Sequence, residues 1–122
     1  MKNIKISVIG LGYVGLPLAI EFGKHFKVIG FDKNEDRVLS LKNSIDKTGE
    51  VPRADFSKSK KITFSSDVKS LKGSDFLIVC VPTPVHNNSE PDLSYLEAAS
   101  EIVASVISNK KHSIVIYEST VY

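Results

Sequence analysis

The amino-acid sequence predicts an α/β fold with a doubly wound, mainly parallel β-sheet and helices on both faces. Short runs rich in Ile, Val and Phe recur along the chain, and most do not alternate with polar residues, as expected of strands buried on both faces of a parallel sheet. Segments with helical periodicity lie between these runs. A glycine-rich turn joins the first run to the first helical segment, an arrangement typical of doubly wound sheets.

Five strands are expected, with helical segments between most of them. Helical spacing of apolar residues predicts a first helix over residues 13–24, a second after a capping Asn34, and a third that begins near Asp92. Only a brief helix, over residues 68–71, fits between the third and fourth strands. Residues 46–59 lack clear periodicity, so we expect a long irregular connection or a short helix with loops. The predicted strands are residues 4–9, 28–31, 62–64, 76–81 and 113–117.

Length, charge and cysteine content exclude several classes of protein. The 122 residues suffice for one domain, residues 1–122, with one core. A formal net charge of +2 provides no strong field to gather nucleic acid or anionic lipid, so neither nucleic acid nor a membrane is expected as a partner. Cys80 is the only cysteine, which excludes an internal disulfide and a cysteine-rich zinc site and favours a reducing cytoplasm. The histidines lie far apart in sequence, and no metal site is expected.

Residues 6–20 form an apolar run after Lys2 and Lys5, which could be a secretory signal or a strand that turns into a helix. No small-residue cleavage site follows the run, and glycines interrupt it where a signal helix prefers Leu and Ala. The run is also shorter than the roughly 18 to 20 residues that span a bilayer. A strand, a turn and a helix are therefore the better interpretation.

The turn within this run is a G-x-G-x-x-G motif, Gly10-Leu11-Gly12-Tyr13-Val14-Gly15. In a Rossmann-type sheet the first glycine permits the tight turn, the second lets the backbone approach a pyrophosphate, and the third lets helix and strand pack closely. The N–H groups at the start of the helix then face the anion. Alone the motif is a weak signal, because glycine-rich strand ends are common.

Asp32 strengthens this signal, since it ends the second strand twenty residues beyond Gly12. A carboxylate there can accept hydrogen bonds from both hydroxyls of an adenosine ribose and would repel the 2′-phosphate of NADP, so the sequence favours NAD. The alternative is a helix-capping or loop aspartate. Lys33 and Arg37 moderate the repulsion, and Arg37 could instead cover the adenine or bind the ribose.

Two further segments follow strands and reach the same edge of the sheet. Val81-Pro82-Thr83-Pro84 follows the fourth strand and brings the Thr83 hydroxyl near the second half of a dinucleotide, although a merely structural turn is the alternative. Tyr117-Glu118-Ser119-Thr120 ends the fifth strand with hydroxyls and a carboxylate. Cys80 lies among apolar residues of the fourth strand, so we interpret it as a buried, inert thiol rather than a nucleophile.

Several stretches together resemble the amino-terminal NAD-binding domain of the UDP-glucose/GDP-mannose dehydrogenase family over essentially the whole chain: GLGYVGLPLA, FDKNEDRV, VPTPV with PDLS, and YESTVY. DKTGEV and IVIYESTVY are most similar to the UDP-N-acetylglucosamine 6-dehydrogenase branch, which oxidises UDP-N-acetylhexosamines for surface polysaccharides. The resemblance implies oxidation of the sugar C6 alcohol to a carboxylate with two NAD molecules in succession.

The resemblance also assigns residues. Thr83 and Thr120 would border the nicotinamide, and Thr120, the candidate catalytic residue, would help to position a water. The candidate cofactor-binding residues are Gly10, Leu11, Gly12, Tyr13, Val14, Gly15, Asp32, Arg37, Val81, Thr83 and Thr120.

Full-length members of the family continue past ESTVY into a helical dimerisation region and a sugar-binding domain with a catalytic cysteine and lysine. Cys80 does not match the motif of that cysteine, so a chain ending at Tyr122 is expected to bind NAD without making NADH. The full-length protein is expected to be a homodimer that binds a UDP-sugar. The alternatives are a non-enzymatic domain that senses NAD or another adenine nucleotide, and another NAD-dependent hydroxyacid or hydroxyacyl dehydrogenase. The hydroxyls of VPTP and EST favour the enzyme.

Overall fold

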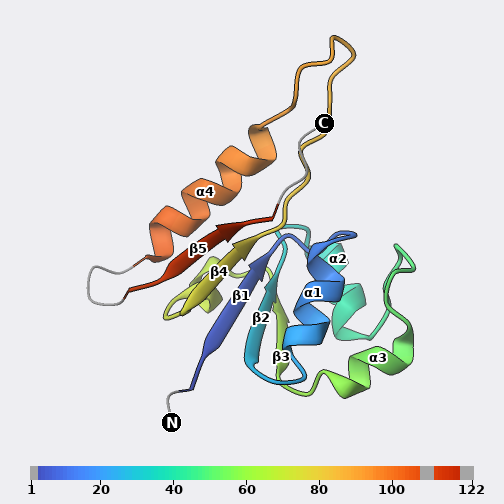
Figure 1. The fold of residues 1–122 in the computed structure, drawn as a ribbon. Helices are drawn as coiled ribbons and strands as arrows, with labels where there is room; N and C mark the ends of the chain where they lie inside the picture. Colours follow the sequence, from blue (N-terminus) through green and yellow to red (C-terminus); the bar gives the residue numbers. More distant parts are fainter. Residues whose placement is uncertain (1–2, 108–111, 119–122) are drawn as a thin grey trace.

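A parallel sheet forms the centre of the structure, a computed structural model that describes residues 3–107 and 112–118 (Figure 1). The order of its strands is β3-β2-β1-β4-β5. The chain moves outward from β1 to β3 and then returns to the other side of β1 with β4, which creates a topological switch point between β1 and β4. The strands are β1 (Lys5–Ile9), β2 (Lys27–Phe31), β3 (Ile62–Ser65), β4 (Phe76–Val79) and β5 (Ile114–Tyr117).

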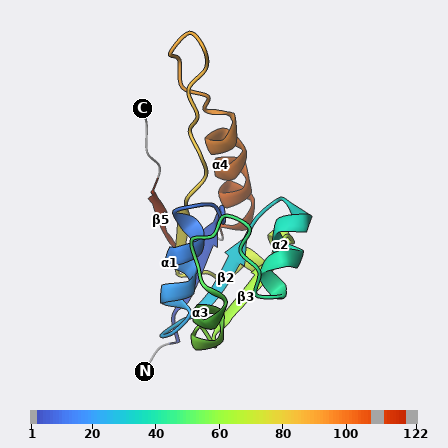
Figure 2. The ribbon, with the colours of Figure 1, turned by 90° about the vertical axis from the view of Figure 1, so that its right-hand side faces the viewer.

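Helices cover both faces of this sheet, as Figures 1 and 2 show. On one face lie α1 (Gly15–Phe22), α2 (Glu35–Lys42) and α3 (Arg53–Lys58), and on the other lie the 3-10 helix η1 (Val68–Leu71) and α4 (Ser94–Val106). Each face has its own core, so the expectation of one core is wrong, because the sheet separates the two apolar layers. Leu16 of α1 and Leu41 of α2 belong to the same core as Val8, whereas Val103 of α4 belongs to the same core as Ile29. The predicted doubly wound α/β fold is confirmed.

The helices begin at or close to the residues that the sequence predicts. Asn34 caps α2 as predicted, because its Oδ1 accepts a hydrogen bond from the Arg37 N–H at 3.1 Å. The first helix begins at Gly15, two residues later than expected, since the residues before it form the turn. The third predicted helix begins at Ser94, where the Ser94 N–H donates to Asp92 Oδ1 at 2.9 Å. The irregular segment 46–59 contains α3, so it is a short helix with loops.

Two strands differ from the prediction. The fourth ends at Val79 rather than at residue 81, although the Cys80 N–H still donates to the Ile9 carbonyl at 2.7 Å. The prediction of burial on both faces is wrong for β5, where Ile114 is 54% exposed and Tyr117 is 48% exposed. The reason is its place at the edge of the sheet, where it pairs with β4 alone in the part of the chain that is described.

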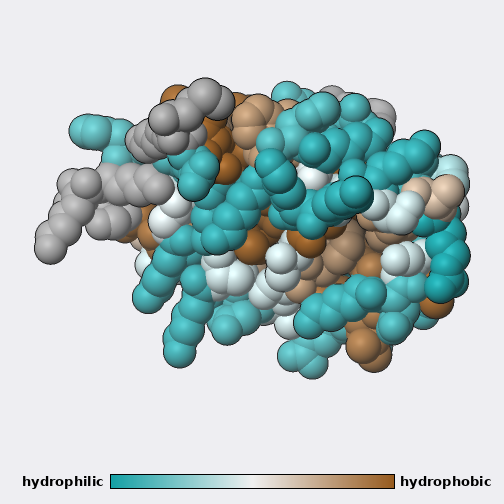
Figure 3. Space-filling view, turned by 90° about the horizontal axis from the view of Figure 1, so that it is seen from below, coloured by the Kyte–Doolittle hydropathy of each residue, from teal (hydrophilic) through white to brown (hydrophobic). Residues whose placement is uncertain are grey.

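The amino ends of the strands face the end of the molecule that lies away from the glycine turn (Figure 1). Seen from this lower end, hydrophilic residues dominate the rim of the surface (Figure 3). Ligands of open α/β sheets bind at the carboxyl ends of the strands, so a binding site is expected at the opposite edge. No helix in the described ranges is both long and apolar enough to cross a membrane.

Candidate cofactor-binding site

The turn between β1 and α1 has no room for side chains at two of its glycines. Gly10 has a φ of 99°, which L side chains rarely adopt, and a Cβ there would lie 2.9 Å from the carbonyl oxygen of Cys80. A Cβ on Gly15 would overlap the carbonyl oxygen of Gly10. The first and third glycines therefore have the roles that the sequence predicts: a tight turn, and close packing of helix against strand.

Gly12 is different, because no atom beyond its adjacent residues lies within 4 Å of the position that its Cβ would occupy. Its open side belongs to a cavity. A pyrophosphate that approaches backbone N–H groups needs such a space, and a side chain would fill it. The geometry of the turn therefore fits a dinucleotide.

The cavity has a volume of about 650 Å³ and opens at the carboxyl ends of β1, β2 and β4. This volume falls within the roughly 300 to 1,000 Å³ of small-molecule and cofactor sites. Its position is the switch point of the sheet, where ligands of doubly wound folds bind. The predicted residues that line it are Gly10, Leu11, Gly12, Asp32, Arg37 and Val81.

One wall of the cavity comes from α4 and was missed by sequence reasoning. Tyr95, Ala98 and Ile102 line the cavity. The sequence predicts the buried stripe of the same helix, with Ala99 and Val103, because its spacing is that of a core-facing helix. Tyr95, Ala98 and Ile102 follow the same spacing one position earlier, so a second apolar stripe beside the core stripe was the available signal.

Asp32 has two functions in the structure. Its Oδ2 accepts a hydrogen bond from the Leu11 N–H at 2.9 Å, and its Oδ1 accepts one from the Asn34 N–H at 3.0 Å. The carboxylate thus holds the glycine turn and also lines the cavity. Each carboxylate oxygen can accept more than one hydrogen bond, so Asp32 keeps capacity for ribose hydroxyls.

Arg37 lines the cavity, but its guanidinium is bound to the protein. Nε and Nη2 donate to the Leu11 carbonyl at 2.9 and 2.7 Å, and Nη1 donates to Asp46 Oδ1 at 2.8 Å. The side chain therefore holds the glycine turn through the Leu11 carbonyl, whereas Asp32 holds it through the Leu11 N–H. The expectation that Arg37 covers adenine or binds ribose stays a prediction.

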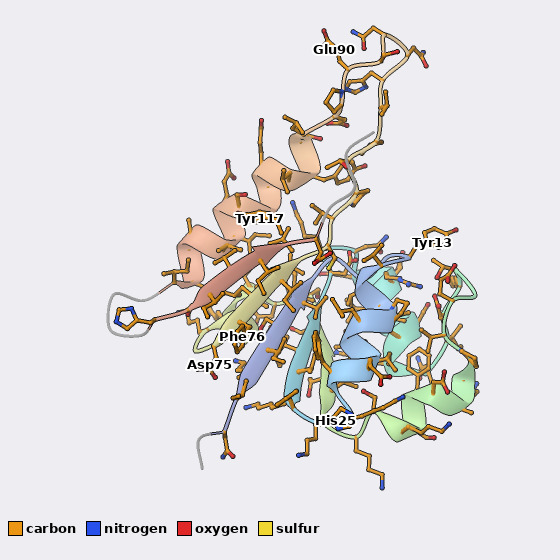
Figure 4. The ribbon with its side chains drawn as sticks, viewed as in Figure 1. Tyr13, His25, Asp75, Phe76, Glu90 and Tyr117 are labelled. Atoms are coloured by element: carbon orange, nitrogen blue, oxygen red, sulfur yellow. The ribbon has the colours of Figure 1, made fainter. Side chains whose placement is uncertain are left out.

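Four other predicted residues within the described ranges do not line the cavity: Tyr13, Val14, Gly15 and Thr83. Tyr13 projects from the glycine turn toward solvent, with 67% of its surface exposed, and Val14 is 52% exposed (Figure 4). Thr83 is buried beside the cavity rather than in its wall. Thr120 lies outside the described residues. At the end of β5, the Tyr117 hydroxyl shares a hydrogen bond with Ser100 of α4 at 3.0 Å.

Cys80 is buried, as predicted, and lies directly after β4 beneath the glycine turn. Burial raises the pKa of its thiol to about 11, with a smaller contribution from the negative charge of Glu118. A thiol with this pKa is almost wholly protonated at neutral pH, and the protonated form is a poor nucleophile. The structural interpretation of Cys80 is therefore the better one.

A parallel sheet with a glycine turn open at its second glycine, and an aspartate after β2 at the switch point, defines a Rossmann-type dinucleotide-binding domain. No group of three or more His, Cys, Asp or Glu residues is placed to hold a metal ion within residues 3–107 and 112–118. The chain belongs to the UDP-glucose/GDP-mannose dehydrogenase family, because the model of that family's NAD binding domain matches residues 4–122. Its cofactor is NAD.

Sequence and structural similarity to known proteins supports this assignment. The UDP-N-acetyl-D-glucosamine 6-dehydrogenase of Pseudomonas aeruginosa is 48% identical over the whole chain, and Protein CapL of Staphylococcus aureus is 50% identical over 98% of it. The structure of a UDP-D-ManNAc dehydrogenase from Pyrococcus horikoshii superimposes on 96% of the chain with a TM-score of 0.86 and 34% identity. The chain spans 28% of the length of each of these proteins.

Proposed function

We propose that the chain is the NAD-binding domain of an enzyme that oxidises the C6 alcohol of a UDP-N-acetylhexosamine to a carboxylate. UDP-N-acetylglucosamine is the proposed substrate, and surface polysaccharide synthesis in the cytoplasm is the proposed setting. The observation that carries the proposal is the cavity at the switch point, bounded by an open Gly12 and by Asp32, in a chain of this family. The family assignment favours this enzyme over a nucleotide sensor or a hydroxyacyl dehydrogenase.

When bound, NAD would supply the hydride acceptor for this oxidation. The chain's own residues bind and orient it: backbone N–H groups of the glycine turn face the pyrophosphate, and Asp32 accepts hydrogen bonds from the ribose hydroxyls. Val81 and Thr83, which follow β4, would border the nicotinamide half, and Thr120 would position a water. The sugar would be held mainly by parts of the full-length protein other than residues 1–122. The full-length protein would be a homodimer.

Replacement of Asp32 tests the proposed cofactor site. A hydrogen bond to a charged group contributes roughly 1.5 to 3 kcal/mol, so Asp32→Ala should weaken NAD binding about tenfold to a hundredfold. The unmodified chain should bind NAD more tightly than NADP. Isothermal titration calorimetry measures both affinities, and Asp36→Ala is the matched control because Asp36 is exposed on α2 and does not line the cavity. Equal affinity for the two cofactors, or an unchanged affinity in Asp32→Ala, would contradict the assignment.

Turnover tests the proposed reaction. Residues 1–122 with NAD and UDP-N-acetylglucosamine should make no NADH, because hydride transfer also needs the sugar to be fixed against the nicotinamide. Positioning of this kind supplies roughly 7 to 11 kcal/mol of a barrier. A protein extended to the full length of the relatives should turn over UDP-N-acetylglucosamine faster than UDP-glucose, followed by NADH absorbance.

Cys80→Ser is the control for this assay. Its thiol is buried, so the variant should behave like the unmodified chain. Turnover by residues 1–122 that disappears in Cys80→Ser would refute both the need for a further sugar-binding part and the structural interpretation of Cys80.

A further inference from the structure

The loop after α2 is organised around one buried carboxylate, Asp46, whose side chain has no exposed surface. Both of its oxygens accept hydrogen bonds. Oδ1 accepts from Arg37 Nη1 at 2.8 Å and from the N–H and hydroxyl of Thr48 at 3.0 and 2.6 Å, and Oδ2 accepts from the N–H groups of Glu50 and Val51, each at 2.9 Å. Segment 46–51 is thus folded around the carboxylate rather than irregular.

Asp46 is charged at neutral pH. Burial alone would raise the pKa of its carboxyl, but hydrogen bonds from Thr48 and Arg37 outweigh this effect and hold the pKa well below its usual range. Because the folded pKa is depressed, the stability that the charge contributes is fully present above the pKa of the unfolded chain and is lost progressively as the pH falls from there through the folded value. The Arg37 charge is therefore balanced by a buried neighbour throughout the neutral range.

The pair fixes the direction of Arg37. With Nη1 on Asp46 and with Nε and Nη2 on the Leu11 carbonyl, the planar guanidinium is held at both ends, and the Arg37 side chain is only 12% exposed. The Leu11 peptide groups are held in turn, since the Leu11 N–H donates to Asp32. C=O and N–H of a trans peptide point in opposite directions, so a carbonyl bound to Arg37 turns the Gly12 N–H away from the guanidinium.

Arg37 is also the cation whose release would change cofactor choice. It lines the same cavity as Asp32, and an arginine near this acid is the group that accommodates the 2′-phosphate of NADP in Rossmann-type domains. An arginine free to rotate could therefore offset the repulsion between Asp32 and that phosphate. An arginine that is fixed on Leu11 and neutralised by Asp46 leaves the repulsion in place.

We propose that Asp46 is a specificity-determining positioning residue: it holds Arg37 on the Leu11 carbonyl, which shapes the glycine turn for the pyrophosphate and withholds the guanidinium from a 2′-phosphate. Preference for NAD over NADP then comes from two carboxylates, Asp32 in the cavity wall and Asp46 behind Arg37.

The test is the ratio of NAD affinity to NADP affinity, measured by calorimetry on the chain and on variants, with thermal unfolding recorded for each. Asp46→Asn keeps the shape of the side chain but removes its charge. We expect it to lower the ratio about tenfold or more, the effect of one hydrogen bond to a charged group. Adding Arg37→Gln to Asp46→Asn should restore the ratio, because the released cation is then absent.

Thr48→Val is the matched control. It removes the hydroxyl hydrogen bond to Asp46 and leaves the charge and Arg37 in place, so it should lower the unfolding temperature without changing the ratio. An Asp46→Asn protein that is folded and weakens NAD and NADP equally, or changes neither, would overturn the proposal.

Arg37→Gln alone is the variant to use if Asp46→Asn does not fold. In Arg37→Gln the Asp46 carboxylate keeps its four other hydrogen-bond donors, so segment 46–51 should stay folded. A neutral side chain that can still donate to the Leu11 carbonyl should weaken both cofactors to the same degree. A ratio that rises about tenfold in Arg37→Gln would mean that Arg37 already reaches the 2′-phosphate, and that outcome also overturns the proposal.

Discussion

Gly12→Val is expected to abolish NAD binding while the chain stays folded. No atom beyond the adjacent residues lies within 4 Å of the position of a Cβ on Gly12, so the fold accepts a side chain there. The same space belongs to the cavity, and a branched side chain would occupy the volume that the pyrophosphate needs. We expect the affinity to fall by more than about 100-fold, which corresponds to roughly 3 kcal/mol.

Calorimetry measures the loss of binding, and circular dichroism with thermal unfolding measures the fold. Gly12→Ala is the graded comparison, because a single methyl group enters the same space and should weaken NAD less than the valine does. NAD affinity that is unchanged in a folded Gly12→Val protein would place the nucleotide elsewhere.

Gly15→Ala, unlike Gly12→Val, is expected to destabilise the fold itself. A Cβ at this position would overlap the Gly10 carbonyl oxygen and lie 3.0 Å from the Cys80 Cβ. Backbone on both sides must move to relieve the overlap, because no flexible side-chain end is involved at Gly10. Overpacking of this kind costs about 3 kcal/mol or more, a large share of the roughly 5 to 15 kcal/mol that stabilises a domain.

Thermal unfolding should therefore show a midpoint lower by roughly 10 °C or more in Gly15→Ala. Gly12→Ala serves as the control, since it makes the same substitution three residues earlier at a position with open space. Equal midpoints for the two variants would mean that the turn adjusts to a side chain at residue 15, and that close packing of α1 on β1 does not depend on the third glycine.

Local features of the site were predictable from the sequence. The glycine turn, the Asn34 cap of α2 and the place of Asp32 after β2 each depend on stereochemistry or hydrogen bonds within a few residues, and the structure has all three. Burial of Cys80 followed from its apolar neighbours in the same way. Periodicity also predicted which runs are strands, because a parallel sheet buries both of their faces.

Contacts between distant segments were decided only in the tertiary structure. Arg37 is 26 residues from the Leu11 carbonyl that it holds and 9 residues from Asp46. Segment 46–59 has no periodicity to show that a carboxylate at its start would be buried and charged. The cavity wall from α4 depends in the same way on the crossing of a helix over the sheet, and the exposure of β5 depends on its place at the edge. A residue pattern carries information about its own strand or helix, whereas these features arise where loops close and bring separate elements into hydrogen-bond distance.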